Sequence, residues 1–213
     1  MNINLLLAET NRSKLYLDYM FKNKIKFCNI VYYSKKKNNV YKYLKRKKIK
    51  NSFFLNTHNV NSKKVEKILK KIKENIIYSG YPGEIVRNKK ILKKSIYHLH
   101  PGDLPYFKGS TTLFYSILLK KKIVVSCFRI NQKIDDGKVV FKKVFKTPKN
   151  KDKINSTFDD EIRAKTLVEF IKFGSKLYKK KKKQNLKSNL YYIAHPLLRY
   201  IVIKKDHLRK TIY

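Results

Sequence analysis

Two histidines and an aspartate in this sequence have the types and spacing of a proton-transfer site. His98 and His100 alternate in an extended segment, so their side chains lie on the same side of a predicted strand. Asp135 follows 35 residues after His100, in the turn NQKIDDG. In an α/β sheet, a strand end and such a turn can meet at the carboxyl edge. Histidine beside a carboxylate is an arrangement for general acid–base catalysis.

The same three residues allow two other interpretations. Two histidines and one aspartate match the ligand count of a metal site, although no helical H-x-x-x-H or H-x-x-E spacing and no cysteine supports one. Histidines in an apolar strand also occur as packing residues. From the residues alone, acid–base catalysis is the preferred interpretation, and we expect no metal.

The elements that must position these residues alternate along the chain. Residues 3–8 are typical of a buried parallel strand, and helical periodicity follows over residues 15–20. Further strand-like runs span residues 26–33, 52–55, 75–78 and 95–99. This alternation predicts an α/β domain with a mostly parallel central sheet. The segments 123–130 and 138–145 flank a turn and predict one antiparallel hairpin.

The predicted domain boundary lies near residue 150. We expect residues 1–150 to form the main domain, and residues 151–213 to add a helix and a small helical or strand extension packed on it. The first strand–helix turn lacks glycine, so the dinucleotide fingerprint G-x-G-x-x-G is absent and NAD is not implied. After the run at 75–78, the segment SGYPG at 79–83 lets the backbone approach a ligand closely or forms an ordinary tight turn.

The composition is strongly basic, with 53 Lys and Arg against 14 Asp and Glu. Only seven of the 53 are arginine, and they are spread along the chain, whereas base and phosphate recognition favours the arginine fork. We therefore expect a solvated basic surface, compatible with an anionic small molecule, and do not expect nucleic acid as a partner. No apolar run approaches the ~20 residues that span a bilayer. A cytoplasmic location, no membrane partner and reduced Cys28 and Cys127 are the corresponding expectations.

The motif HLHPGDLPYFKGS, followed by NQKIDDG, resembles the folate-dependent formyltransferase family. The residues that carry the resemblance are His100, Pro101, Leu104, Pro105, Phe107, Gly109, Asp135 and Gly137. The segments GSTTLFYS and YYIAHPLL are most similar to the bacterial branch that formylates nucleotide-linked amino sugars. The resemblance implies a Rossmann-like formyltransferase domain that transfers the formyl group of 10-formyltetrahydrofolate to a primary amine.

The resemblance also implies roles for individual residues. His100 is expected to stabilise the formyl oxyanion, and Asp135 to take the proton of the amine and orient His100. His98 stands where the family has an asparagine, and we expect a ring N–H to donate in its place, more strongly if protonated. The expected folate-binding residues are Ser79, Gly80, Tyr81, Pro82 and Gly83. The expected substrate-binding residues are Lys108, Gly109, Ser110 and Thr111.

Other functions remain open at this stage. The acceptor amine can instead be glycinamide ribonucleotide or methionyl-tRNA. However, the glycine-bearing phosphate loop of glycinamide ribonucleotide formyltransferases and the further C-terminal domain of methionyl-tRNA formyltransferases have no counterpart in these 213 residues. A domain that hydrolyses the formyl donor, or has lost activity, is compatible with His98. A basic nucleic-acid-binding protein without enzymatic activity is the last alternative. The expected partner is a small anionic amine, and a homodimer is allowed but not specified.

Overall fold

The computed structural model describes residues 3–73, 75–148, 151–177 and 189–210, and a seven-stranded sheet forms its centre. The strands are β1 (Ile3–Ala8), β2 (Ile30–Ser34), β3 (Ser52–Asn56), β4 (Asn75–Ser79), β5 (Ile96–His100), β7 (Ile123–Arg129) and β8 (Val139–Phe145). Their order is β3-β2-β1-β4-β5-β7-β8. The pairs from β3 to β5 are parallel, which confirms the mostly parallel sheet.

The other end of the sheet is antiparallel. The predicted hairpin is confirmed as the pair β7–β8. A second antiparallel pair, β5–β7, was not predicted. It arises because the chain leaves β5 through a loop and a helix and returns along the same edge in the opposite direction. As a result, His98 and His100 lie opposite Phe128 and Ser126 of β7, and His98 also contacts Tyr78 of β4.

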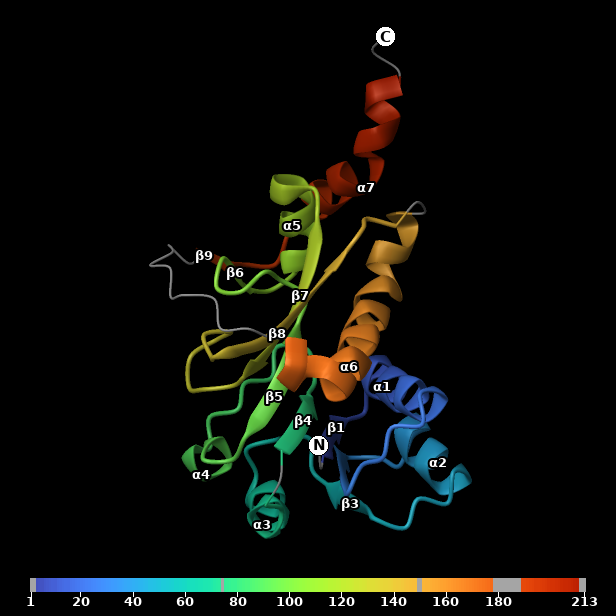
Figure 1. Cartoon of the computed structure of the whole chain (residues 1–213), viewed down its shortest axis with the longest axis vertical. Helices are drawn as coiled ribbons and strands as arrows, with labels where there is room; N and C mark the ends of the chain where they lie inside the picture. Colours follow the sequence, from blue (N-terminus) through green and yellow to red (C-terminus); the bar gives the residue numbers. More distant parts are fainter. Residues whose placement is uncertain (1–2, 74, 149–150, 178–188, 211–213) are drawn as a thin grey trace.

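Helices cover both faces of the sheet (Figure 1). One face carries α1 (Asn11–Lys22), α2 (Asn39–Arg46), α5 (Thr112–Lys120) and α6 (Phe158–Leu177). The opposite face carries α3 (Lys63–Lys71) and the short α4 (Lys89–Leu92). Strand β1 shows the alternation that divides the two cores, because Leu5 and Leu7 pack with α1 while Leu6 and Ala8 pack with α3.

The C-terminal part closes over the loop that follows β5. A small parallel ladder joins β6 (Phe107–Gly109) to β9 (Asn189–Tyr191), and α7 (Pro196–Lys210) follows. Before α6, the 3-10 turn η1 (Lys151–Asn155) contacts α6 and α7. Helix α6 itself packs on α1 and on strands β5, β7 and β8. The boundary proposed at residue 150 stays a prediction.

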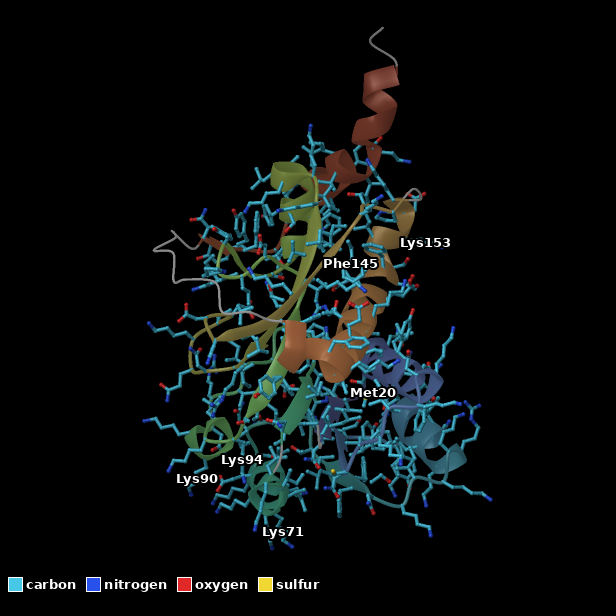
Figure 2. The ribbon with its side chains drawn as sticks, in the orientation of Figure 1. Met20, Lys71, Lys90, Lys94, Phe145 and Lys153 are labelled. Carbon is cyan, nitrogen blue, oxygen red and sulfur yellow. The ribbon has the colours of Figure 1, made fainter. Side chains whose placement is uncertain are left out.

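Basic side chains lie on separate parts of the protein (Figure 2). Lys71, Lys90 and Lys94 lie around the end formed by α3 and α4, whereas Lys153 of η1 lies far from them, below α7 in this view. Both cysteines are free, and Cys127 is buried. No helix in the described part of the chain is long and apolar enough to cross a membrane.

Candidate active site

A cavity of about 680 Å³ opens at the carboxyl ends of β4 and β5. Several segments distant in sequence form its wall. The predicted site residues that line it are Gly80, Tyr81, Pro82, Gly83, His98, His100, Gly109, Ser110, Thr111 and Asp135. The sheet therefore brings the two histidines, the aspartate and most of the SGYPG loop to one place.

His100 is held by contacts at both ring nitrogens and is only 4% exposed. Its Nε2 lies 2.8 Å from the carbonyl oxygen of Phe107, so Nε2 carries the proton that this bond requires. Its Nδ1 lies 3.4 Å from Oδ2 of Asp135. Burial lowers the pKa of His100, and the negative charge of Asp135 opposes that shift. A neutral His100 therefore turns the lone pair of Nδ1 toward the carboxylate.

Asp135 lies in a turn that fixes its carboxylate toward β6. Its backbone is left-handed, with φ +48°, a conformation that aspartate adopts more readily than most residues. Its Oδ2 accepts a 2.9 Å hydrogen bond from the backbone N–H of Gly109. The segment after β5 and the β7–β8 turn are thus joined directly beside His100 and Asp135.

His98 has a different arrangement from the one expected for an asparagine substitute. Its Nδ1 lies 3.1 Å from the carbonyl oxygen of Tyr78 and therefore donates. Burial, with the nearby charges of Arg12 and Arg163, lowers the pKa of His98 well below 6.5. The ring is then neutral at pH 7, and Nε2 is an acceptor. This disfavours the expected donation to an oxyanion by a free or protonated ring N–H.

The loop after β5 is fixed by hydroxyl groups. Thr112 donates to the Pro101 carbonyl at 2.8 Å, and Ser126 donates to the Gly102 carbonyl at 2.6 Å. A Cβ on Gly102 would lie 2.6 Å from His100 Nε2. Glycine at position 102 therefore leaves room for the bond that His100 makes.

Glu84 organises the predicted folate loop, although no motif in the sequence singles it out. Its carboxylate accepts hydrogen bonds from the hydroxyl groups of Tyr33 and Tyr78 and from the backbone N–H groups of Tyr81 and Val60. These contacts connect the loop to two strands and to the segment before α3. They raise the pKa of both buried tyrosines in addition to the larger effect of desolvation.

Two of the predicted binding residues lie outside the lining of the cavity. The Ser79 hydroxyl contacts Ser13 Oγ at 3.0 Å and accepts from Arg12 Nε at 3.2 Å. The ammonium of Lys108 pairs with Asp136 in the β7–β8 turn. Both contacts support neighbouring loops. A direct role in binding for either residue stays a prediction.

The cavity wall also includes charged residues that the sequence did not single out. Arg163 of α6 binds both carboxylate oxygens of Asp159, at 2.7 and 2.9 Å. It also donates to the carbonyl of Leu99, the residue between the two histidines, at 3.1 Å. Arg12 and Asp160 line the same wall. Among the described residues, no group of three or more His, Cys, Asp or Glu is arranged to hold a metal ion.

Several solved formyltransferases have similar structures. A sugar N-formyltransferase from a Shewanella species gives a TM-score of 0.60 at 16% identity, covering 95% of this chain and 87% of that one. Methionyl-tRNA formyltransferase from Clostridium thermocellum gives 0.59 at 16% identity, covering 92% and 74%. The N-formyltransferase from Helicobacter canadensis, in complex with folinic acid and dTDP-3-aminofucose, gives 0.58 at 17% identity, covering 90% and 71%.

No protein-family model and no curated protein sequence matches the chain. At 16–17% identity, the structural matches establish the fold. They cover at least nine tenths of this chain. The resemblance of the His-Pro and Asp-x-Gly motifs is thereby confirmed at the level of architecture: this chain has the fold of the formyltransferases.

Proposed function

We propose that this chain transfers the formyl group of 10-formyltetrahydrofolate to a primary amine on a nucleotide-linked amino sugar. The observation that carries the proposal is the placement of His100. Its ring is fixed between the Phe107 carbonyl and Asp135 in the wall of the cavity. An acid–base pair at the carboxyl edge of a formyltransferase fold suits the transfer of a group to an amine.

The two residues of the pair can move one proton during the reaction. The Nδ1 lone pair of neutral His100 and Oδ2 of Asp135 face each other at 3.4 Å, and together they can receive an N–H donor. When an amine attacks a formyl carbon, its nitrogen becomes acidic and the formyl oxygen gains negative charge. His100 Nδ1 takes the proton while Asp135 stabilises the imidazolium, and the new N–H donates to the oxyanion.

The proton then leaves with the departing group. As the bond between the formyl carbon and the donor nitrogen breaks, His100 returns the proton to that nitrogen. The amine becomes a formamide, the donor becomes tetrahydrofolate, and no net proton is consumed. Among the described residues, this scheme needs only His100 and Asp135 for proton transfer, and it assigns no donor role to His98.

The wall beside the pair suits a flat donor such as a pterin. It includes the apolar side chains of Val86, Phe128, Ile130 and Ile134. Opposing backbone comes from the loop 80–83, where Gly83 has φ +74° and a Cβ there would meet no atom within 4 Å. The folinic acid in the Helicobacter canadensis structure supports a folate donor here. The dTDP-3-aminofucose in the same structure supports an amino-sugar acceptor.

The test is transfer of labelled formyl from 10-formyltetrahydrofolate to three acceptors: a dTDP-linked amino sugar, glycinamide ribonucleotide and methionyl-tRNA. We expect transfer to the sugar. His100→Ala and Asp135→Ala should each lower turnover at least about a hundredfold, the typical effect of removing an oxyanion or proton-transfer group. Lys14→Gln, on the exposed side of α1, is the control and should retain activity.

Each alternative function predicts a different result in the formyl-transfer assay or in a binding assay with RNA and folate. Near-normal transfer by either active-site variant, or no transfer to any amine, would overturn the proposal. Release of formate without an acceptor would identify a hydrolase. Salt-dependent RNA binding without folate binding would identify a basic nucleic-acid-binding protein.

A further inference from the structure

Arg12 carries a positive charge that no carboxylate neutralises directly. Its Nη2 donates to the Gly80 carbonyl at 2.6 Å, and its Nε donates to Ser79 Oγ at 3.2 Å. Both acceptors are uncharged, and in the described part of the chain no carboxylate lies within ion-pair distance of Arg12. A guanidinium has five N–H groups, so three remain for other partners. Because Arg12 lines the cavity, an anion bound there can use them.

Asp160 carries the complementary charge on the same wall. The neighbouring Asp159 is fully engaged by Arg163. Asp160, in contrast, makes no hydrogen bond and no ion pair with any residue that the structure describes. It lies in the first turn of α6, which packs against α1, the helix that carries Arg12 (Figure 1). In the described part of the chain, Arg12 thus has no carboxylate partner and Asp160 has no hydrogen-bond or ion-pair partner; Lys133 and Arg199 are further cations in the lining of the cavity.

Both charges lie close to the reacting centre. Arg12 bonds to the Gly80 carbonyl and His98 bonds to the Tyr78 carbonyl. These carbonyls are two residues apart in an extended chain, or roughly 7 Å. Asp160 is adjacent to the Asp159–Arg163 pair, and Arg163 donates to the carbonyl between His98 and His100. A molecule of a few atoms can reach both charges and the catalytic pair.

We propose that Arg12 and Asp160 form the acceptor subsite, in which Arg12 binds an anionic group of the acceptor and Asp160 binds its ammonium before transfer. The acceptor is then an amine that carries a carboxylate or a phosphate near its nitrogen. This inference rests on the proposed transfer of a formyl group to a primary amine and specifies the charged group that the amine carries. Beside the subsite, Asp159 and Arg163 of the same wall neutralise each other. The other charged residues that line the cavity are Glu84, Lys133, Asp135 and Arg199.

The subsite can be tested by binding, without turnover. Glycine and glycinamide differ in the carboxylate, and glucosamine 6-phosphate and glucosamine differ in the phosphate. Each probe is titrated calorimetrically into the full chain saturated with folinic acid. We expect the wild-type protein to bind the anionic member of at least one pair about ten- to hundredfold more tightly, the effect of a charged hydrogen bond. Which pair shows the difference distinguishes a carboxylate from a phosphate.

Variants separate the two charges. Arg12→Gln should abolish the preference for the anionic member and leave the neutral amine unaffected, whereas Asp160→Asn should weaken both members of a pair. Lys14→Gln and Glu161→Gln are matched controls on the same helices, outside the cavity lining, and should change nothing.

Two results would overturn the inference: equal affinity for both members of each pair in the wild type, or an anion preference that survives Arg12→Gln. A loss of folinic acid affinity in Arg12→Gln with the preference intact would also refute it, because Arg12 would then only support the loop at 79–83. If folinic acid and the probes bind as expected but no formyl group is transferred, the proposed function fails while the subsite stands.

Discussion

Replacement of Glu84 should destabilise the protein and the loop at 79–83 together. Both carboxylate oxygens are engaged: Oε1 accepts from Val60 N at 2.8 Å, and Oε2 accepts from Tyr78 Oη at 2.9 Å, from Tyr81 N at 3.1 Å and from the Tyr33 hydroxyl. Glu84→Ala removes all four bonds at once. Glu84→Gln retains the shape of the side chain and most of its hydrogen-bonding capacity.

The magnitude follows from what each substitution leaves unpaired. Tyr33 is 0% and Tyr78 is 4% exposed, so their hydroxyl groups cannot recover water where they lie. An unsatisfied buried polar group costs about 1–3 kcal/mol, and Glu84→Ala should lower the free energy of unfolding by roughly 3–5 kcal/mol for the two hydroxyl groups together. In Glu84→Gln, both hydroxyl groups can accept from the amide, and only Tyr81 N–H faces another donor. A loss of about 1–2 kcal/mol is expected.

The assay is urea unfolding of the wild type and both variants, with folinic acid affinity measured in parallel under native conditions. Both the free energy of unfolding and the affinity for folinic acid should be lowest in Glu84→Ala, intermediate in Glu84→Gln and highest in the wild type. The reason is that the same carboxylate fixes the loop and the two tyrosines. Tyr33→Phe is the matched control, since it removes one hydroxyl and leaves no unpaired group of its own. A Glu84→Ala protein as stable as the wild type would refute the reasoning.

Two further predictions concern the histidines. Gly102→Ala places a Cβ 2.6 Å from His100 Nε2 and 2.7 Å from the Phe107 carbonyl oxygen, so the His100 ring must move. We expect kcat to fall about 10- to 100-fold and the affinity for folinic acid to stay nearly unchanged. An unchanged kcat would contradict the assigned geometry. Because burial lowers the pKa of His98, the unfolded chain binds a proton below pH 6.5 that the folded chain does not. Stability should be complete above pH 6.5 and fall as the pH drops toward the lowered pKa. His98→Asn should flatten that slope in urea unfolding between pH 7 and 5, and a slope equal to that of the wild type would contradict the shift.

The sheet was predictable because its signal is local. Each parallel strand is a short apolar run followed by a polar turn, and such a run is buried on both faces whichever neighbours it finds. The predicted strand at 95–99 is β5, Ile96–His100. The pairing of β5 with β7 had no such signal. The antiparallel register pairs residues 26 to 32 positions apart. It depends on how the intervening loop and α5 fold back, which neither strand segment encodes.

The supporting residues of the site were missed for a related reason. Glu84 is an ordinary acidic residue beside a turn until Tyr33, 51 positions earlier, is placed against it. In the sequence, Arg12 belongs to a polar segment that is expected only to begin a helix. In the structure, Thr10 caps that helix by accepting a hydrogen bond from Ser13 N. Glu84 and Arg12 both contact residues distant in the sequence. Residue type and spacing can identify candidate catalytic residues, but they do not show which distant residues position those candidates.

The contacts of the two histidines assign them different roles, although the sequence motif does not distinguish them. In sequence they are equivalent members of one alternating segment, and the substitution of histidine for an amide at position 98 invites the same donor role. In the fold, each ring donates to a different backbone carbonyl: Nδ1 of His98 to Tyr78, and Nε2 of His100 to Phe107. The remaining nitrogen is therefore Nε2 in His98 and Nδ1 in His100, and of these two nitrogens it is Nδ1 of His100 that faces a carboxylate. A carboxylate stabilises an imidazolium, so His100 can cycle between base and donor. Burial and the positive charges of Arg12 and Arg163 lower the pKa of His98, so its ring stays neutral and its Nε2 can accept a hydrogen bond but cannot donate one to an oxyanion.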